Sequence, residues 1–313
     1  MVKSKSKVAI IGSGFVGAST AFAMAMNGIV AEMVLIDVNK DKAEGEAMDI
    51  NHGLAFLSQM SIYAGDYSDV KDCDVIIVTA GANRKPGETR LDLAKKNTVI
   101  MKEITKNIME YYNQGVILVV SNPVDIMTYM ISKWSGLPAG KVIGSGTVLD
   151  SSRFRYLLGE KLGVDVRNVH GYMIGEHGDS QLPVWSAANI AGMQFDEYCA
   201  VHNITVDKDA LVQDVKKAGA EVIKRKGATY YAIALSVNRV VEALLKDQNS
   251  VLTVGTVVKN KYGLDGVALN LPCIVNKNGI ERVLDISFAE NELEALRHSA
   301  AQIKSIIDEV KDL

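Results

Sequence analysis

The first half of the chain alternates short apolar runs with longer stretches in which apolar residues recur at helical spacing. The short runs are typical of buried strands and lie at 8–11, 33–37, 75–79, 116–120 and 142–144. The first helical pattern ends near residue 27, and others lie at 40–50, 91–112 and 125–135. This alternation predicts an α/β fold, a Rossmann-type doubly wound sheet that is mostly parallel.

The second half has a different pattern, which begins near Gly144-Ser145-Gly146-Thr147. It predicts a helix up to about residue 162, strands over 252–258 and 267–275, and further helices over 209–227, 228–246 and 290–310. The apolar face of the last helix is expected to consist of Leu293, Leu296, Ile303, Ile307 and Val310. Because 313 residues suffice for about two hydrophobic cores, we expect a Rossmann domain at 1–145 and an α+β catalytic domain at 146–313.

A glycine-rich turn, Gly12-Ser13-Gly14-Phe15-Val16-Gly17, connects the first predicted strand to the first predicted helix. Glycines let the backbone approach a pyrophosphate, and the N-terminus of the helix offers it free N–H groups. Asp37 ends the next strand, where a carboxylate accepts hydrogen bonds from ribose hydroxyls and disfavours a 2′-phosphate. An acid that caps a turn is the ordinary alternative for Asp37. The pattern as a whole predicts binding of NAD.

Two polar segments follow strands of the predicted sheet, at the edge where such sheets bind ligands. Ser121-Asn122-Pro123 supplies an amide that either binds a carboxamide or a substrate hydroxyl, or belongs to a plain turn. Gly81–Arg90 contains the cations Arg84, Lys85 and Arg90 among glycines and a proline. This composition fits a mobile lid that closes over an anion, and it fits a solvated basic loop equally well.

His177 is the strongest candidate for acid–base chemistry. It lies in the polar stretch Gly171–Ser180, between glycines, where a turn can hold an imidazole in a cleft. Asp150 and Arg153 are expected on one face of a helix because they are three residues apart. They form either a surface ion pair worth about 1 kcal/mol at most, or a catalytic pair. In the second case, Asp150 holds the His177 ring and Arg153 clamps a carboxylate.

The composition argues against several classes of partner. A net charge of −3, with 48% hydrophobic and 23% charged residues, is typical of a soluble globular protein without the basic field that nucleic acid or an anionic membrane requires. Glycines and polar residues interrupt the uncharged stretch 8–31, so neither a targeting segment nor a membrane span is expected. The three cysteines form no CxxC pair, and metal-ligand spacings are absent, so we expect a reduced, cytoplasmic protein without a metal.

The order of the motifs resembles that of one enzyme superfamily, the L-lactate and malate dehydrogenases. The sequence contains, in this order, GSGFVG, GANRKPGETR, SNP, LDSSR and GEHGDS, and the resemblance covers essentially its full length. It is most similar to the bacterial lactate dehydrogenases, because GEHGD, LPVW and GATYY match that branch. The resemblance implies an NAD-dependent 2-hydroxy-acid dehydrogenase that interconverts pyruvate and L-lactate.

The resemblance also implies a role for each matching residue. His177 would donate a proton in keto-acid reduction and accept it in the reverse direction, with Asp150 orienting the ring. Arg153 would bind the substrate carboxylate, and Arg90, carried in by lid closure, would polarise the carbonyl. Thr229 would face the substrate methyl group. The expected contacts with NAD are made by Gly12, Gly14, Phe15, Val16, Gly17, Asp37 and Asn122, the last of which would also contact substrate.

Arg155 and His170 match positions that bind fructose 1,6-bisphosphate at a subunit interface in allosteric bacterial members of this superfamily. The match implies a homotetramer that works in glycolysis and fermentation and is activated by this intermediate. Taken by themselves, an arginine on a helix and a histidine at a strand end are unremarkable.

Arg84 departs from the pattern of the lactate-specific branch. Typical lactate dehydrogenases have glutamine at this lid position, whereas malate dehydrogenases have an arginine that pairs with the second carboxylate of oxaloacetate. An uncompensated cation beside a monocarboxylate slows the reaction, since about 1.4 kcal/mol corresponds to a tenfold change in rate. Lactate-type residues at Glu88, Glu176 and Thr229 favour pyruvate. Malate dehydrogenase is the alternative.

Overall fold

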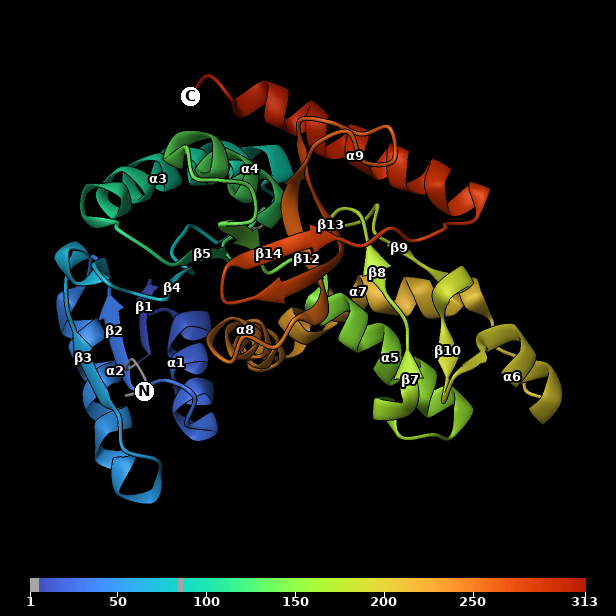
Figure 1. Ribbon diagram of the computed structural model, residues 1–313, viewed down its shortest axis with the longest axis horizontal. Coiled ribbons are helices and arrows are strands. Elements are labelled where there is room, and N and C mark those ends of the chain that lie inside the picture. Colours follow the sequence, from blue (N-terminus) through green and yellow to red (C-terminus); the bar gives the residue numbers. More distant parts are fainter. Residues whose placement is uncertain (1–5, 84–86) are drawn as a thin grey trace.

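A computed structural model describes residues 6–83 and 87–313 of the chain. The described residues form a nine-stranded central sheet in the order β14-β13-β12-β6-β5-β4-β1-β2-β3 (Figure 1). The parallel strands are β1 Lys7–Ile11, β2 Glu32–Ile36, β3 Ser61–Ala64, β4 Val75–Val78, β5 Val116–Val119 and β6 Val142–Gly144. The antiparallel strands are β12 Ser250–Val258, β13 Val267–Asn276 and β14 Gly279–Val283. The predicted α/β fold is confirmed, and strands from the second half extend the same sheet.

Helices cover both faces of the parallel part of the sheet (Figure 1). α1 Phe15–Asn27 and α2 Lys40–Gly53 follow β1 and β2, while α3 Arg90–Tyr111 and α4 Val124–Ser135 follow β4 and β5. Because right-handed crossovers run in opposite directions along the sheet from β1 and from β4, the two pairs of helices lie on opposite faces. β4 and β5 are therefore buried along their whole length, which explains their uninterrupted apolar sequences.

The second half adds helices and short strands, some packed against the core of the central sheet and others around a second, smaller core. Its helices are α5 Val148–Leu162, α6 Phe195–His202, α7 Lys208–Lys226, α8 Tyr231–Leu245 and α9 Glu290–Val310. Its short strands pair in two small sheets and are β7 Val169–His170, β8 Met173–Ile174, β9 Leu182–Pro183, β10 Asn189–Ile190 and β11 Met193–Gln194. Phe154, Leu158 and Phe195 are buried in this second core. No helix in the described part of the chain combines the length and apolar character needed to cross a membrane.

Most predicted elements are present, with ends that differ by a few residues. β6 and α9 lie at the predicted 142–144 and 290–310. The residues of α9 that are buried as predicted are Leu296, Ile303, Ile307 and Val310, whereas Leu293 is half-buried. The sequence pattern does not predict β3 or β14, because each strand carries too few buried apolar residues. In β3, for example, only Ile62 is buried.

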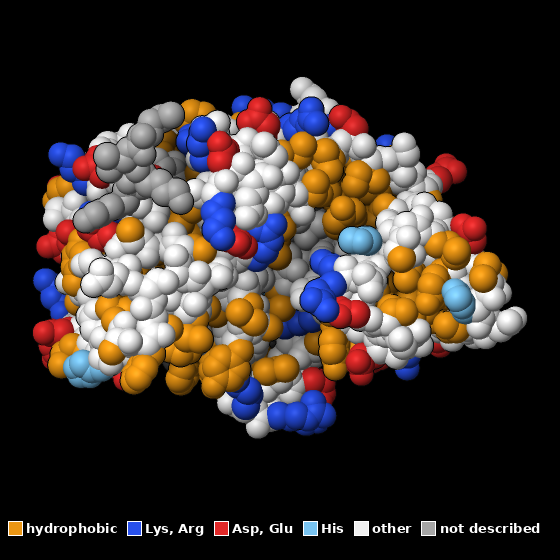
Figure 2. Space-filling model, turned by 60° about the horizontal axis from the view of Figure 1, so that its bottom comes forward, with side chains coloured by type: hydrophobic (Ala, Val, Ile, Leu, Met, Phe, Trp, Pro, Cys, Tyr) orange, Lys and Arg blue, Asp and Glu red, His pale blue; other side chains and the backbone are white. Residues whose placement is uncertain are grey.

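Large apolar side chains remain exposed on α1 and α8. On α1 they include Phe22 and Met26, and on α8 they include Tyr231 and Leu235, each pair one helical turn apart. The two helices pack against each other, so these exposed apolar residues lie on two neighbouring helices. On the face drawn in Figure 2, hydrophobic side chains gather along the lower edge.

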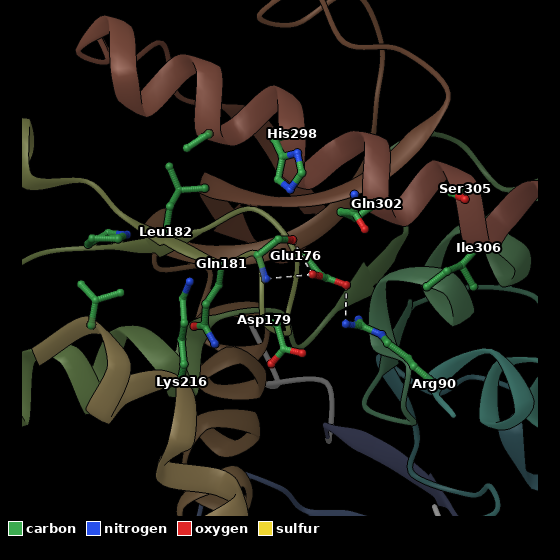
Figure 3. Close-up of a pocket in the computed structure, with 14 residues that line it drawn as sticks. Arg90, Glu176, Asp179, Gln181, Leu182, Lys216, His298, Gln302, Ser305 and Ile306 are labelled. Atoms are coloured by element: carbon green, nitrogen blue, oxygen red, sulfur yellow. Dashed lines mark hydrogen bonds and ion pairs between the residues drawn. The ribbon is translucent and has the colours of Figure 1, made fainter. Parts of the chain in front are cut away.

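A cavity of about 640 Å³ opens between α7, α9 and the loop that follows β8 (Figure 3). Lys216 lines it from α7, His298 from α9 and Gln181 from the loop. Arg90 and Glu176 also line it. The cavity therefore adjoins the polar stretch that contains His177.

Candidate active site

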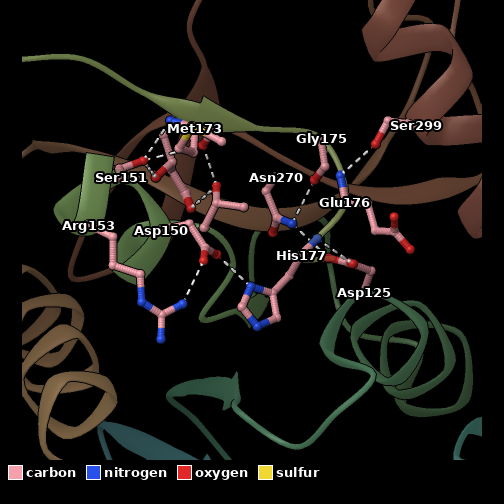
Figure 4. Close-up of polar contacts among 12 residues, drawn as sticks. Asp125, Asp150, Ser151, Arg153, Met173, Gly175, Glu176, His177, Asn270 and Ser299 are labelled. Atoms are coloured by element: carbon pink, nitrogen blue, oxygen red, sulfur yellow. Dashed lines mark hydrogen bonds and ion pairs between the residues drawn. The ribbon is translucent and has the colours of Figure 1, made fainter. Parts of the chain in front are cut away.

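Asp150, Arg153 and His177 come together at the first turns of α5 (Figure 4). The Nδ1 atom of His177 lies 2.6 Å from Oδ2 of Asp150, and Nη1 of Arg153 donates to Oδ1 of the same carboxylate at 3.0 Å. The Asp150 side chain is 1% exposed, whereas those of Arg153 and His177 are 18% and 26% exposed. A buried carboxylate thus orients an imidazole and a guanidinium that both remain accessible to a ligand.

The charges of this group stabilise one another. Burial alone would raise the pKa of Asp150, but the charge and hydrogen bond of His177, followed by those of Arg153, outweigh it and lower the pKa. Burial alone would lower the pKa of His177, but the charge and hydrogen bond of Asp150, with the charge of Asp125, outweigh it and raise the pKa. The site therefore favours a protonated His177 whose Nε2 atom faces away from Asp150, as a proton donor requires.

The backbone of His177 is anchored by residues that the sequence pattern does not single out. Its N–H donates to Oδ2 of Asp125 at 2.8 Å. Asn270 in β13 donates from Nδ2 to Oδ1 of Asp125 and to the carbonyl oxygen of Gly175, both at 2.7 Å. Asp125 is 1% exposed, and burial raises its pKa. Its place just after Asn122-Pro123 is the one local signal that it lies near the carboxyl edge of the sheet.

Arg90 is the first residue of α3, one residue before the predicted start of that helix. Thr89 caps this start through a capping box. The Arg90 guanidinium forms an ion pair with Glu176, donates from Nη2 to the carbonyl oxygen of His177 at 3.2 Å, and lies 3.8 Å from Oδ2 of Asp125. Figure 4 shows the Glu176 carboxylate and the His177 ring pointing to different sides of the loop. Arg90 therefore lies on the Glu176 side.

The turn between β1 and α1 contains the close approaches that its glycines predict. Gly12 has a φ of 105°, and a side chain there would meet the backbone of Ala80. A Cβ atom on Gly17 would lie 1.9 Å from the carbonyl oxygen of Gly12. Gly14 faces open space and begins α1 without a side-chain cap. The N–H groups of the first turn are thus open to a phosphate.

Asp37 lies beside this turn, directly after β2. Its Oδ2 atom accepts from the N–H of Ser13 at 2.6 Å, and its Oδ1 atom accepts from the N–H of Asn39 at 2.9 Å. Phe15 is 70% exposed and Val16 is half-buried. An open helix start beside a fixed carboxylate fits the pyrophosphate and ribose of NAD.

Other predicted contacts lie at the ends of neighbouring elements. Asn122 follows β5 and is exposed, and its carbonyl oxygen accepts from Nδ2 of Asn97 at 2.6 Å. Thr229 is half-buried and lies just before α8. Arg84 lies outside the described residues, together with the two residues that follow it in the predicted lid Gly81–Arg90.

Arg155 lies on α5 and His170 ends the neighbouring strand β7. Nε of Arg155 donates to the carbonyl oxygen of Val169 at 2.7 Å, and Nη2 donates to that of Val166 at 3.4 Å. Burial lowers the pKa of Arg155, while His170 is exposed. Arg155 thus contacts the backbone of the strand that carries His170, and the effector role of both residues stays a prediction.

Comparison with known proteins gives the same assignment for both halves of the chain. The lactate/malate dehydrogenase NAD-binding domain matches residues 6–144, and the α/β C-terminal domain of the same family matches residues 147–313. The chain belongs to the lactate/malate dehydrogenase family. It is 53% identical over 308 residues to the L-lactate dehydrogenase of Thermoanaerobacter sp. (strain X514). This match covers 97% of the present chain and 99% of that relative.

Solved structures of the family superpose over almost the whole chain. The L-lactate dehydrogenase from Clostridium thermocellum is 65% identical, with a TM-score of 0.89 over 98% of this chain and 99% of that one. The ligand-bound minor L-lactate dehydrogenase from Enterococcus mundtii is 43% identical, with a TM-score of 0.95 over 98% of both chains. The present chain is therefore an NAD-dependent oxidoreductase that acts on the CH–OH group of a hydroxy acid. The predicted family, cofactor and enzyme class are confirmed.

Proposed function

We propose that this enzyme interconverts pyruvate and L-lactate with NAD. The grouping of Asp150, Arg153 and His177 carries the proposal, because one buried acid holds both a proton donor and a guanidinium that can bind a carboxylate. The relatives described above are all named L-lactate dehydrogenases, and malate dehydrogenase gains no support from them.

Each residue of the site has a separate task in this reaction. Arg153 binds the substrate carboxylate through the side of its guanidinium that does not face Asp150. His177 donates its Nε2 proton to the keto oxygen during reduction and accepts it during oxidation, while Asp150 keeps the ring in place and stabilises its charge. Arg90 polarises the carbonyl as negative charge develops on oxygen. Thr229 lies beside the substrate methyl group.

When bound, NAD accepts the hydride that leaves the substrate carbon during oxidation, and its reduced form provides that hydride during reduction. The turn and the first helix hold its pyrophosphate through backbone N–H groups, and Asp37 binds the adenosine ribose. The residues that we assign to this site are Gly12, Gly14, Phe15, Val16, Gly17, Asp37 and Asn122. We assign residues 1–145 to the cofactor domain and residues 146–313 to the substrate domain.

A paired assay tests the choice of substrate. The expected result is a higher kcat/KM for pyruvate than for oxaloacetate, with and without fructose 1,6-bisphosphate. A preference for oxaloacetate under both conditions would reject the proposal in favour of malate dehydrogenase.

Arg84 is the residue to vary in this assay. We predict that Arg84→Gln raises the ratio of the kcat/KM for pyruvate to that for oxaloacetate. The substitution removes a cation that the second carboxylate of oxaloacetate could pair with, and pyruvate has no such carboxylate. Lys85→Gln is the matched control, since it removes the neighbouring charge of the same predicted lid. An unchanged ratio in Arg84→Gln would exclude this residue from substrate selection.

We further propose a cytoplasmic homotetramer that serves glycolysis and fermentation and is activated by fructose 1,6-bisphosphate. Arg155, which donates to the backbone of the strand that carries the exposed His170, supports an anion site, and exposed apolar side chains on α1 and α8 support contact between subunits. Sedimentation would measure the assembly, and titration of pyruvate with and without the bisphosphate would measure activation. A monomer in sedimentation would contradict the proposed tetramer. Rates that do not change when fructose 1,6-bisphosphate is added would contradict the proposed activation.

A further inference from the structure

The guanidinium of Arg90 lies in a set of acceptors on the opposite side of the loop from the His177 ring. One nitrogen is paired with Oε1 of Glu176, and the other reaches the His177 carbonyl oxygen at 3.2 Å and Oδ2 of Asp125 at 3.8 Å. The side chains of both acids are almost completely buried, that of Glu176 being 5% exposed and that of Asp125 0% exposed. Two buried carboxylates therefore share this cation.

The Glu176 carboxylate is also held by contacts other than the one with Arg90. Its Oε2 atom accepts hydrogen bonds from the N–H of Ser180, at 3.1 Å, and from the hydroxyl of the same residue. The backbone N–H of Glu176 donates to the hydroxyl of Ser299 in α9 at 2.8 Å. With Oε2 occupied, Oε1 is the atom that receives the guanidinium. Glu176 is thus a preorganised receptor for a cation.

Gly178 leaves the space that this receptor needs. A Cβ atom at position 178 would lie 2.1 Å from Nη1 of Arg90 and 3.0 Å from the carboxyl carbon of Glu176. A residue with a side chain would therefore displace the guanidinium. Glu176 and Gly178 together define a docking place for Arg90.

We propose that Glu176 is a positioning residue that holds Arg90 in a resting place and releases it when a keto acid binds. The inference rests on the proposed function, in which Arg90 must reach the substrate carbonyl. Undocking leaves the buried Glu176 without its cation, and this cost opposes substrate binding. The negative charge of the substrate, and the charge that develops on its oxygen, compete with Glu176 for Arg90. Glu176 therefore sets how readily the site accepts its substrate.

Binding of oxamate, an unreactive carboxylate analogue of pyruvate, in the presence of NADH measures this competition directly. We expect Glu176→Gln to bind oxamate about five- to tenfold more tightly than the wild type and to lower the KM for pyruvate more than it changes kcat. Gly178→Ala, which blocks the docking place sterically and keeps the charge of Glu176, is expected to act in the same direction. In an Arg90→Gln background, Glu176→Gln is expected to have no effect on oxamate binding.

The outcomes separate this inference from the proposed function. If the wild type binds no oxamate with NADH, the proposed function fails. If the wild type binds it and neither Glu176→Gln nor Gly178→Ala binds it more tightly, the docking role of Glu176 is wrong. Weaker binding in Glu176→Gln that disappears in the Arg90→Gln background also overturns it, because Glu176 would then support Arg90 in the bound state.

Discussion

Asp150 carries the central charge of the site, and Asp150→Asn tests what that charge does. The substitution preserves the size of the side chain but removes a negative charge 2.6 Å from Nδ1 of His177 and 3.0 Å from Nη1 of Arg153. The protonated form of His177 then loses its main stabilising partner. We expect pyruvate reduction to lose more rate than lactate oxidation, because only reduction begins with a protonated His177.

Coulomb's law gives the size of the effect. Two unit charges about 4 Å apart attract each other by about 4 kcal/mol at an effective dielectric constant near 20, and 1.36 kcal/mol corresponds to a factor of ten. The full interaction is therefore worth about three powers of ten. Because the His177 side chain is 26% exposed, solvent screens part of it. We expect kcat/KM for pyruvate at neutral pH to fall by about 100- to 1000-fold.

Steady-state rates in both directions, each measured across a pH series, check this prediction. Asp165→Asn is a matched control, because Asp165 forms an ion pair with Arg167 in which both side chains are substantially exposed. The control should keep wild-type rates. A loss of less than about threefold in Asp150→Asn, with an unchanged pH profile, would show that the charge of Asp150 does not govern proton donation.

Three further predictions follow from the same structure. Because the folded-state pKa of His177 is raised above its ordinary value near 6.5, kcat/KM for pyruvate should stay high below that raised pKa and fall as pH increases through it. The rate of lactate oxidation should rise over the same pH interval. If the initial rates of both directions instead rose or fell together with pH, this prediction would be wrong. Asp37→Ser should improve the kcat/KM for NADPH relative to NADH by at least about tenfold, because the carboxylate no longer repels a 2′-phosphate; an unchanged ratio would remove Asp37 from cofactor selection. Asn270→Ala should lower the free energy of unfolding in urea by about 2–4 kcal/mol, since it deprives buried Asp125 and the Gly175 carbonyl of a donor. A change below about 0.5 kcal/mol would mean that this anchor is not needed.

The elements of the fold could be predicted where a local pattern determines them. Fully buried parallel strands such as β4 and β5 have to be continuously apolar, so they stand out in the sequence. β3 pairs with β2 on one side only, at the edge of the sheet, and is less apolar. The position of β3 depends on its pairing with a strand that is distant in sequence. A short sequence pattern holds no information about such a pairing.

The candidate site divides in the same way. His177, Asp150 and Arg153 were found because their residue types and spacing point to chemistry. Asp125 and Asn270 were missed, since their contact joins residues 145 positions apart and neither has a distinctive local pattern. The contacts of Arg90 were also beyond the sequence pattern, because they depend on acceptors from two other elements. The roles proposed for these residues remain predictions.

The hydrogen bonds among Asp125, Asn270 and His177 connect the two halves of the chain. Asp125 belongs to the half that carries the nucleotide turn, whereas Asn270 and His177 belong to the other half, and β12 pairs with β6 in the same sheet. The half that carries the nucleotide turn and the loop that carries His177 are thus connected directly through these hydrogen bonds. Substitution of Asp125 or Asn270 is therefore expected to shift the backbone of His177 relative to the first half of the chain.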